Sequence, residues 1–172
     1  ITDGGSAANV VPAHSAGNFL VRAANDTYLE ELKQRVLNCF SGAATATGAR
    51  LEYKWEEHHY TAMLNNLTIG GLFVKNMRRL GRKIEMEDPD KSFGSTDFGN
   101  VSQLVPGMHA SFAVAGYGIP IHTPQFVEAA VSESGLNSML QAAQGLAMTV
   151  ADLIADTELM AEVKKEFYTA KP

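Results

Sequence analysis

The sequence predicts an α/β protein of two parts, and two kinds of hydrophobic periodicity carry that prediction. Residues 51–56 alternate between apolar and charged side chains, which is the period of a half-buried strand. Residues 29–43 and 136–154 place apolar side chains at spacings of three and four, which is typical of amphipathic helices. Because strand periodicity gives way to helices near residue 58, we expect one part over residues 1–58 and another over residues 59–172.

The first part is predicted to form, in order, a turn, a strand, a helix and a second strand. Asp3 and the two glycines after it supply turn chemistry, and the run from Phe19 to Ala23 favours an extended chain. Asn25 is a candidate cap for the helix, and Gly48 is typical of a helix end. A strand, helix and strand in this order make an incomplete ferredoxin-like unit.

In the second part, residues 94–125 combine a turn, an apolar run and a histidine. Asp97 closes a Gly-Ser-Thr-Asp turn and is expected to cap a short helix over about residues 98–104. The small apolar residues 109–115 predict a buried strand. The glycine-rich loop after it would deliver His122 to the C-terminal edge of a sheet, where open α/β sheets bind their ligands.

Two histidine-containing segments are candidates for metal binding. His122, on a tight loop, has three possible roles from its chemistry alone: metal ligand, general base or structural residue. The run from Glu56 to His59 offers four potential ligands, but neighbouring residues on an extended chain point to opposite faces. At most two of the four converge on one ion, so we interpret this run as a solvated exit from the sheet.

Composition limits the classes of function. The 172 residues are 45% apolar, which is enough for one ordinary core or two partial ones. The net charge of −5 is scattered and argues against nucleic-acid partners, and no apolar run approaches the roughly twenty residues that span a bilayer. The single cysteine, Cys39, excludes an internal disulfide and fits a reducing compartment, so we expect a cytoplasmic protein.

Several motifs taken together resemble one enzyme family. GSTDFGNVSQLVPG, HTPQF and the downstream AAQGLAMTVADL are similar to the C-terminal end of the metal-dependent amidohydrolases that include aminoacylase, glutamate carboxypeptidase and succinyl-diaminopimelate desuccinylase. The branch of p-aminobenzoyl-glutamate hydrolase and β-alanyl-dipeptide hydrolase is the most similar. GGSAANVVP and FLVRA resemble the GGxxxNVIP motif and the following strand of that family's lid domain.

The resemblance implies a domain assignment. Residues 1–58 would be the C-terminal part of a lid or dimerisation domain with an incomplete ferredoxin-like fold. Residues 59–172 would be the C-terminal part of a zinc-peptidase-like α/β catalytic domain. A homodimer formed through the lid domain is part of the same expectation.

The resemblance also implies roles for individual residues. His122 matches a histidine that binds one of two zinc ions in the family, with manganese in some members. Five other residues would contact or line the substrate site: Asn9, Arg22, Ser95, Thr96 and His109. The family's asparagine and arginine hold a carboxylate or carbonyl of the substrate, and the asparagine reaches across the dimer. The alternatives are a turn-forming role for Asn9, a solvated head for Arg22 and ordinary packing for His109.

The implied activity is hydrolysis of the amide bond of an N-acyl amino acid or dipeptide by a metal-activated water. The general base and the remaining metal ligands belong to the family's N-terminal half and have no counterpart in this sequence. One histidine cannot hold a catalytic zinc, which needs about three protein ligands, so we expect the 172-residue chain alone to be inactive. The alternative is a non-catalytic module that dimerises through an unpaired sheet edge.

Overall fold

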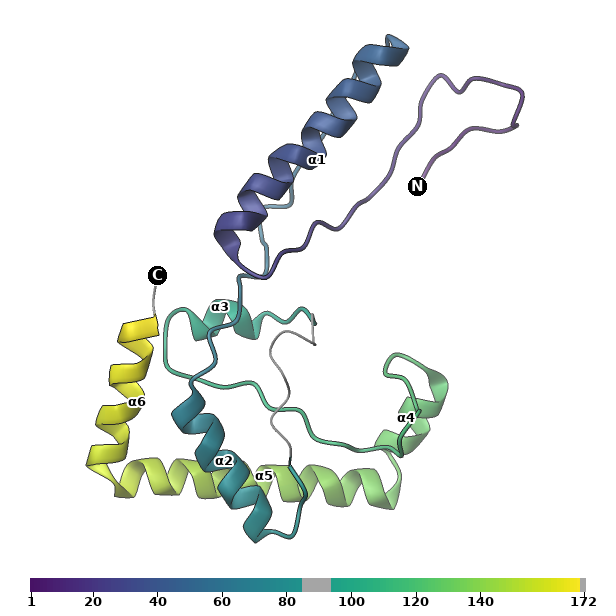
Figure 1. The fold of residues 1–172 in the computed structure, drawn as a ribbon. Coiled ribbons are helices and arrows are strands. Elements are labelled where there is room, and N and C mark those ends of the chain that lie inside the picture. Colours follow the sequence, from purple (N-terminus) through teal and green to yellow (C-terminus); the bar gives the residue numbers. More distant parts are fainter. Residues whose placement is uncertain (85–93, 171–172) are drawn as a thin grey trace. The chain divides into compact units, whose positions relative to one another are not determined.

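The computed structural model describes residues 1–84 and 94–170, in two compact units that divide between His59 and Tyr60 (Figure 1). The described residues form these helices: α1 (Asp26–Thr47), α2 (Leu67–Arg79), α3 (Phe98–Ser102), α4 (Pro124–Ala130), α5 (Glu133–Ala155) and α6 (Thr157–Ala170). The division falls beside the boundary that the sequence predicts. The assignment of the two parts to a lid and a catalytic domain stays a prediction.

The first unit, residues 1–59, contains α1 and a looped N-terminal segment. The side chain of Asn25 accepts a hydrogen bond from the Tyr28 N–H at 2.8 Å and so caps the helix. Gly48 ends it in the left-handed conformation, with a φ of 71° that favours glycine. The predicted cap and stop of this helix are both confirmed.

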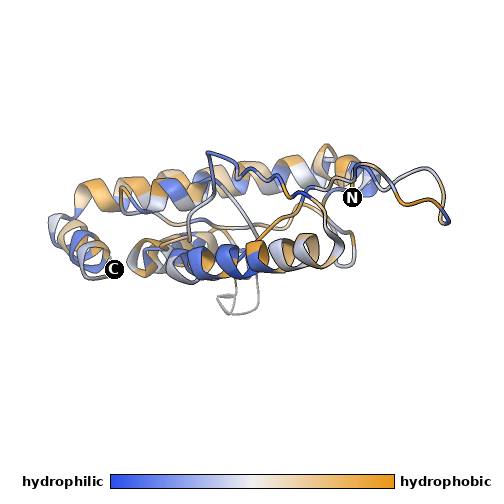
Figure 2. Ribbon diagram, turned by 90° about the horizontal axis from the view of Figure 1, so that it is seen from above, coloured by the Kyte–Doolittle hydropathy of each residue, from blue (hydrophilic) through white to orange (hydrophobic). Residues whose placement is uncertain are grey.

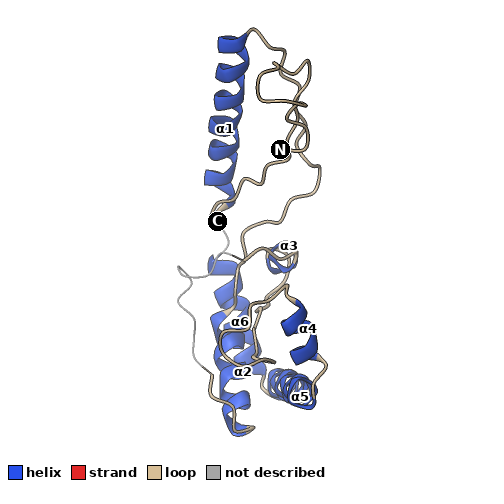
Figure 3. Cartoon of the chain, turned by 90° about the vertical axis from the view of Figure 1, so that its right-hand side faces the viewer, coloured by secondary structure: helices blue, strands red, loops and turns tan. Residues whose placement is uncertain are grey.

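The segments predicted as strands have no regular secondary structure. Residues 19–23, 51–56 and 109–115 are not paired into strands, and the described part of the chain has a single isolated bridge, between Asp3 and Ala16 (Figure 3). A strand needs hydrogen bonds to a neighbouring strand, which local sequence does not supply. The α/β fold class therefore stays a prediction.

The second unit, residues 60–170 as described, is built on α5, which contacts α2, α4 and α6. The buried apolar side chains come from three of these helices: Phe73, Met77, Ala142, Val163 and Phe167. The face of α5 that packs on α2 carries small residues, and a Cβ added to Gly145 would lie 2.3 Å from the Met77 Sδ. This close approach lets two helices share a narrow core.

Two asparagines tie the helices of this core together. Asn66 caps α2 by accepting from the Ile69 N–H at 3.0 Å, and its amide donates to the Val163 carbonyl of α6 at 3.0 Å. Asn76 is fully buried, and its amide donates to Asp152 at 2.9 Å and to Thr149 at 3.3 Å, both on α5. The second unit is thus fixed by polar links as well as by apolar contacts.

Glu166 of α6 completes the N-terminus of α2. Its carboxylate accepts hydrogen bonds from the backbone N–H groups of Leu67 and Thr68, which have no partner inside the helix. Partial burial is the largest influence and raises the pKa of Glu166. Hydrogen bonds from the Thr68 hydroxyl and from the two backbone N–H groups outweigh it, so the pKa of Glu166 lies below its usual value of 4.5.

Helix α5 is unusual in its polarity. No charged residue lies between Glu133 and Asp152, and in Figure 2 orange turns with blue ones between them run along the helix. Large apolar side chains lie on the face turned away from the core, with exposed fractions of 50% at Leu146 and 76% at Ile154. Among the described helices none has both the length and the hydropathy needed to cross a membrane.

Candidate functional site

His122 lies in a tight loop that is fixed by the start of α4. The Thr123 hydroxyl donates to the Pro120 carbonyl at 2.8 Å and accepts from the Phe126 N–H at 3.2 Å. Thr123 is thereby the cap of α4, and Pro124 supplies a first helical residue whose backbone needs no N–H. The hydrogen bond from Thr123 to Pro120 closes the turn in which His122 lies.

The backbone of His122 is in the left-handed region, with a φ of 63°. It is the non-glycine residue with a positive φ among those described, and such a conformation costs about 1–2 kcal/mol for a residue with a Cβ. The surrounding turn and cap hold this conformation. The side chain is exposed, so it is accessible to a metal ion or a substrate, and the roles of metal ligand and general base both stay open.

The Gly-Ser-Thr-Asp turn precedes α3, but Asp97 does not cap this helix with its side chain. Asp97 occupies the cap position with helical backbone angles, φ −65° and ψ −14°, whereas a capping side chain needs an extended backbone. The Thr96 hydroxyl instead accepts from the Phe98 N–H at 3.2 Å. The prediction for Asp97 was therefore wrong, and Thr96 stabilises the turn.

His109 lies beside this turn through an aromatic contact. The rings of His109 and Phe98 have their centroids 5.7 Å apart. The backbone N–H of His109 donates to the side-chain oxygen of Asn65 at 3.0 Å. The backbone N–H of Phe98 also donates a hydrogen bond to the Thr96 hydroxyl. Phe98 thus links the neighbourhoods of Thr96 and His109, while Ser95 is exposed next to them.

The remaining candidates lie in the first unit. Asn9 and Arg22 are exposed there, whereas Ser95, Thr96, His109 and His122 belong to the second unit. Within the second unit, Thr96 and His109 both contact Phe98. That they share one site with the other candidates stays a prediction.

The described residues do not complete a metal site by themselves. In residues 1–84 and 94–170 no three histidine, cysteine, aspartate or glutamate side chains gather closely enough to hold an ion. His122 would supply one of the roughly three protein ligands that a catalytic zinc needs. The run from Glu56 to His59 is exposed throughout, as expected for a solvated exit.

Arg82 has a positioning role that the sequence did not reveal. Its guanidinium donates to the Ala113 carbonyl at 3.0 Å and to Ser138 and Gln141 of α5 at 3.3 and 3.4 Å. It also borders a shallow, open depression on the surface whose other lining residues lie on α5: Glu133, Ser134, Asn137, Ser138 and Gln141. These hydrogen bonds fix the segment before the His122 loop against α5. In the sequence, the position of Arg82 just after α2 was the only hint of this role.

Comparison with known proteins gives two relatives. No family model matches the chain. A mouse Xaa-Arg dipeptidase is 37% identical over 169 residues, and a human Xaa-Arg dipeptidase is 36% identical over 169 residues. The match covers 97% of this chain but 39% and 38% of the relatives, so the chain spans about two fifths of their length. These names support the predicted likeness to dipeptidases and amidohydrolases without selecting a branch.

Proposed function

We propose that this chain is part of a metal-dependent amidohydrolase that cleaves dipeptides. The similarity over nearly the whole chain to two Xaa-Arg dipeptidases carries the proposal. The motifs around the Gly-Ser-Thr-Asp turn and His122 point to the same class of enzyme. Of the substrates that the sequence leaves open, a dipeptide with a basic second residue is favoured by the name of these relatives.

In this proposal His122 is one ligand of a zinc or manganese ion. Its exposure and the fixed backbone of its loop support that role, because a ligand must be accessible and must keep its direction. A catalytic zinc needs about three protein ligands, and the family resemblance implies that the others come from further polypeptide. The 172-residue chain alone is then inactive.

The substrate contacts are assigned to the residues that match the family's motifs. Arg22 is exposed, and a guanidinium binds a carboxylate with two parallel hydrogen bonds and stays charged at neutral pH. Asn9 adds a neutral amide donor, and it would come from the partner subunit of a homodimer. Ser95, Thr96 and His109 would line the substrate site in the second unit. The segments 51–56 and 109–115 would pair into sheets of an α/β fold.

The decisive experiment compares two histidine variants of the intact protein. We expect His122→Ala to lower both the bound metal per subunit and the hydrolysis of an Xaa-Arg dipeptide, because an imidazole ligand is lost. His58→Ala removes an exposed histidine of the first unit and should change neither quantity. If the His122→Ala protein keeps its full metal content, His122 is not a ligand. If the intact protein carries no stoichiometric metal and no activity, the alternative of a dimerisation module is favoured.

A further inference from the structure

The N-terminal segment of the first unit forms a closed loop with Asn9 near its tip. At the base, the N–H groups of Thr2 and Asp3 donate to the Ala16 carbonyl at 2.9 and 3.1 Å, and the Ala16 N–H donates to the Asp3 carbonyl at 2.9 Å. At the tip, the Val10 N–H donates to the Ala7 carbonyl at 3.2 Å. Asn9 lies inside that terminal turn and is exposed.

The two arms of the loop also meet between the base and the tip. Gly5 has a φ of 87°, and a Cβ added to it would lie 3.0 Å from the Cβ of Pro12. The closeness at this point requires a glycine on one arm. Residues 4–13 contain no charged side chain, so no ion pair within these residues holds the arms together.

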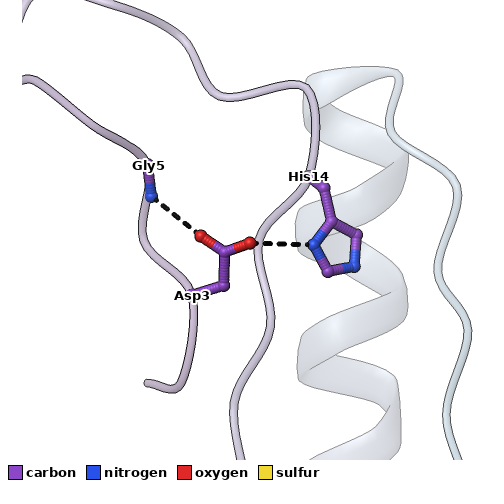
Figure 4. A network of polar contacts seen from close by, with 3 residues as sticks. All are labelled: Asp3, Gly5 and His14. Atoms are coloured by element: carbon purple, nitrogen blue, oxygen red, sulfur yellow. Dashed lines mark hydrogen bonds and ion pairs between the residues drawn. The ribbon is translucent and has the colours of Figure 1, made fainter.

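The side chain of Asp3 joins the arms (Figure 4). Its Oδ2 lies 3.1 Å from the Nδ1 of His14 on the returning arm, and its Oδ1 accepts from the Gly5 N–H at 3.2 Å on the outgoing arm. The hydrogen bond with His14, and after it the one from Gly5, holds the pKa of Asp3 below its usual value of 3.8. The carboxylate therefore stays ionised and available as an acceptor over the physiological pH range.

We propose that Asp3 and His14 are positioning residues that hold the loop carrying Asn9 in its binding conformation. The inference rests on the proposed function in one respect, namely that Asn9 contacts the substrate. A loop rich in small residues loses conformational freedom when its tip binds a ligand, and that loss weakens affinity. The hydrogen bond between Asp3 and His14, which we call the clamp, restricts the loop before a ligand binds. Its removal therefore raises KM and leaves kcat unchanged.

The pair is exposed, with 75% of the His14 and 51% of the Asp3 side chain open to solvent. Exposed pairs contribute little to global stability, so a local measurement separates a clamp from an ordinary surface contact. The first test is amide hydrogen exchange in the 172-residue chain, read at Gly5 and Val10. We expect His14→Ala to speed exchange at both amides roughly two- to fivefold, while the unfolding midpoint of the chain does not move.

Two further variants and the pH make this test specific. His14→Asn keeps a side-chain N–H donor near the position of Nδ1 and should restore slow exchange, whereas the control His58→Ala should have no effect. The clamp is complete above pH 3.8 and is lost as the pH falls through the lower pKa of folded Asp3, so wild-type and His14→Ala chains should then exchange alike. Equal exchange in wild-type and His14→Ala chains near neutral pH would overturn the clamp.

The second test uses the intact enzyme and a dipeptide substrate. We expect His14→Ala to raise KM roughly two- to fivefold at constant kcat, and to have no such effect when Asn9→Ala is already present. An unchanged KM in an active enzyme would overturn the positioning role while leaving the hydrolase assignment in place. If the wild-type protein has no activity, the hydrolase assignment fails, and the exchange experiment still decides whether the clamp exists.

Discussion

The close packing of α2 on α5 gives a quantitative test at Gly145. An alanine there would gain about 0.5–1 kcal/mol from the better helix propensity of alanine. Its Cβ would lie 2.3 Å from the Met77 Sδ and 3.2 Å from a ring carbon of Phe73. Met77 is fully buried and Phe73 is 3% exposed, so a shift of either side chain means repacking the core.

Overpacking of a tight core typically costs about 1–3 kcal/mol. After the propensity gain is subtracted, we expect Gly145→Ala to lower the free energy of unfolding of the second unit by about 1 kcal/mol. With a urea dependence of about 1–3 kcal/mol per molar, the midpoint would fall by roughly 0.3–1 M. Urea titration followed by the NMR signals of Val163 and Phe167 measures the core of this unit directly.

Gly71→Ala is the matched control on α2. Nothing lies within 4 Å of a Cβ added at Gly71, which is exposed in the helix interior, so only the propensity gain remains. This variant should raise the free energy of unfolding by about 0.5–1 kcal/mol. If Gly145→Ala stabilises the unit as much as Gly71→Ala does, the proposed steric conflict with Met77 is wrong.

Three further substitutions test other contacts of the second unit. Glu166→Gln should lower its stability by about 1–2 kcal/mol near neutral pH. Because the pKa of folded Glu166 is depressed, the difference in the free energy of unfolding from wild type should be complete above pH 4.5. It should vanish as the pH falls through that lower pKa, which urea titrations at several pH values would measure. Asn76→Ala should cost about 1–3 kcal/mol in the same assay, since it removes a buried donor from Asp152, and a near-neutral result would contradict the buried network. Thr123→Ala should cost about 1 kcal/mol and speed amide exchange at the start of α4, and unchanged exchange at Phe126 would show that the cap does not fix the His122 loop.

The helices were predictable from the sequence where their signals are local. Asn25 and Gly48 were the cap and stop candidates, and they lie just beyond the two ends of α1. Such residues act on backbone groups within about one turn, so a short window of sequence contains the whole interaction. The amphipathic spacing over 136–154 likewise indicated α5.

The rest depended on contacts that a local window does not contain. The expected strand over 109–115 needs a pairing partner that the local sequence does not identify. Asp97 was expected to cap α3 because of its residue type, but its backbone angles exclude that hydrogen bond. The left-handed backbone of His122 follows from a turn and a cap acting together, and although histidine is enriched among non-glycine residues with a positive φ, most histidines do not adopt one. The hydrogen bonds of Arg82 to α5 join residues more than fifty positions apart in the sequence.

Helix α5 places its small residues inward and its bulky aliphatic ones outward, which reverses the usual arrangement of a surface helix. An exposed apolar stripe favours association between molecules, whereas the net charge of −5 opposes it. Salts such as sulfate strengthen attraction between apolar surfaces, so they would favour association of molecules through this stripe. A polypeptide that covers the stripe would at once protect the chain from precipitation and enlarge its narrow core.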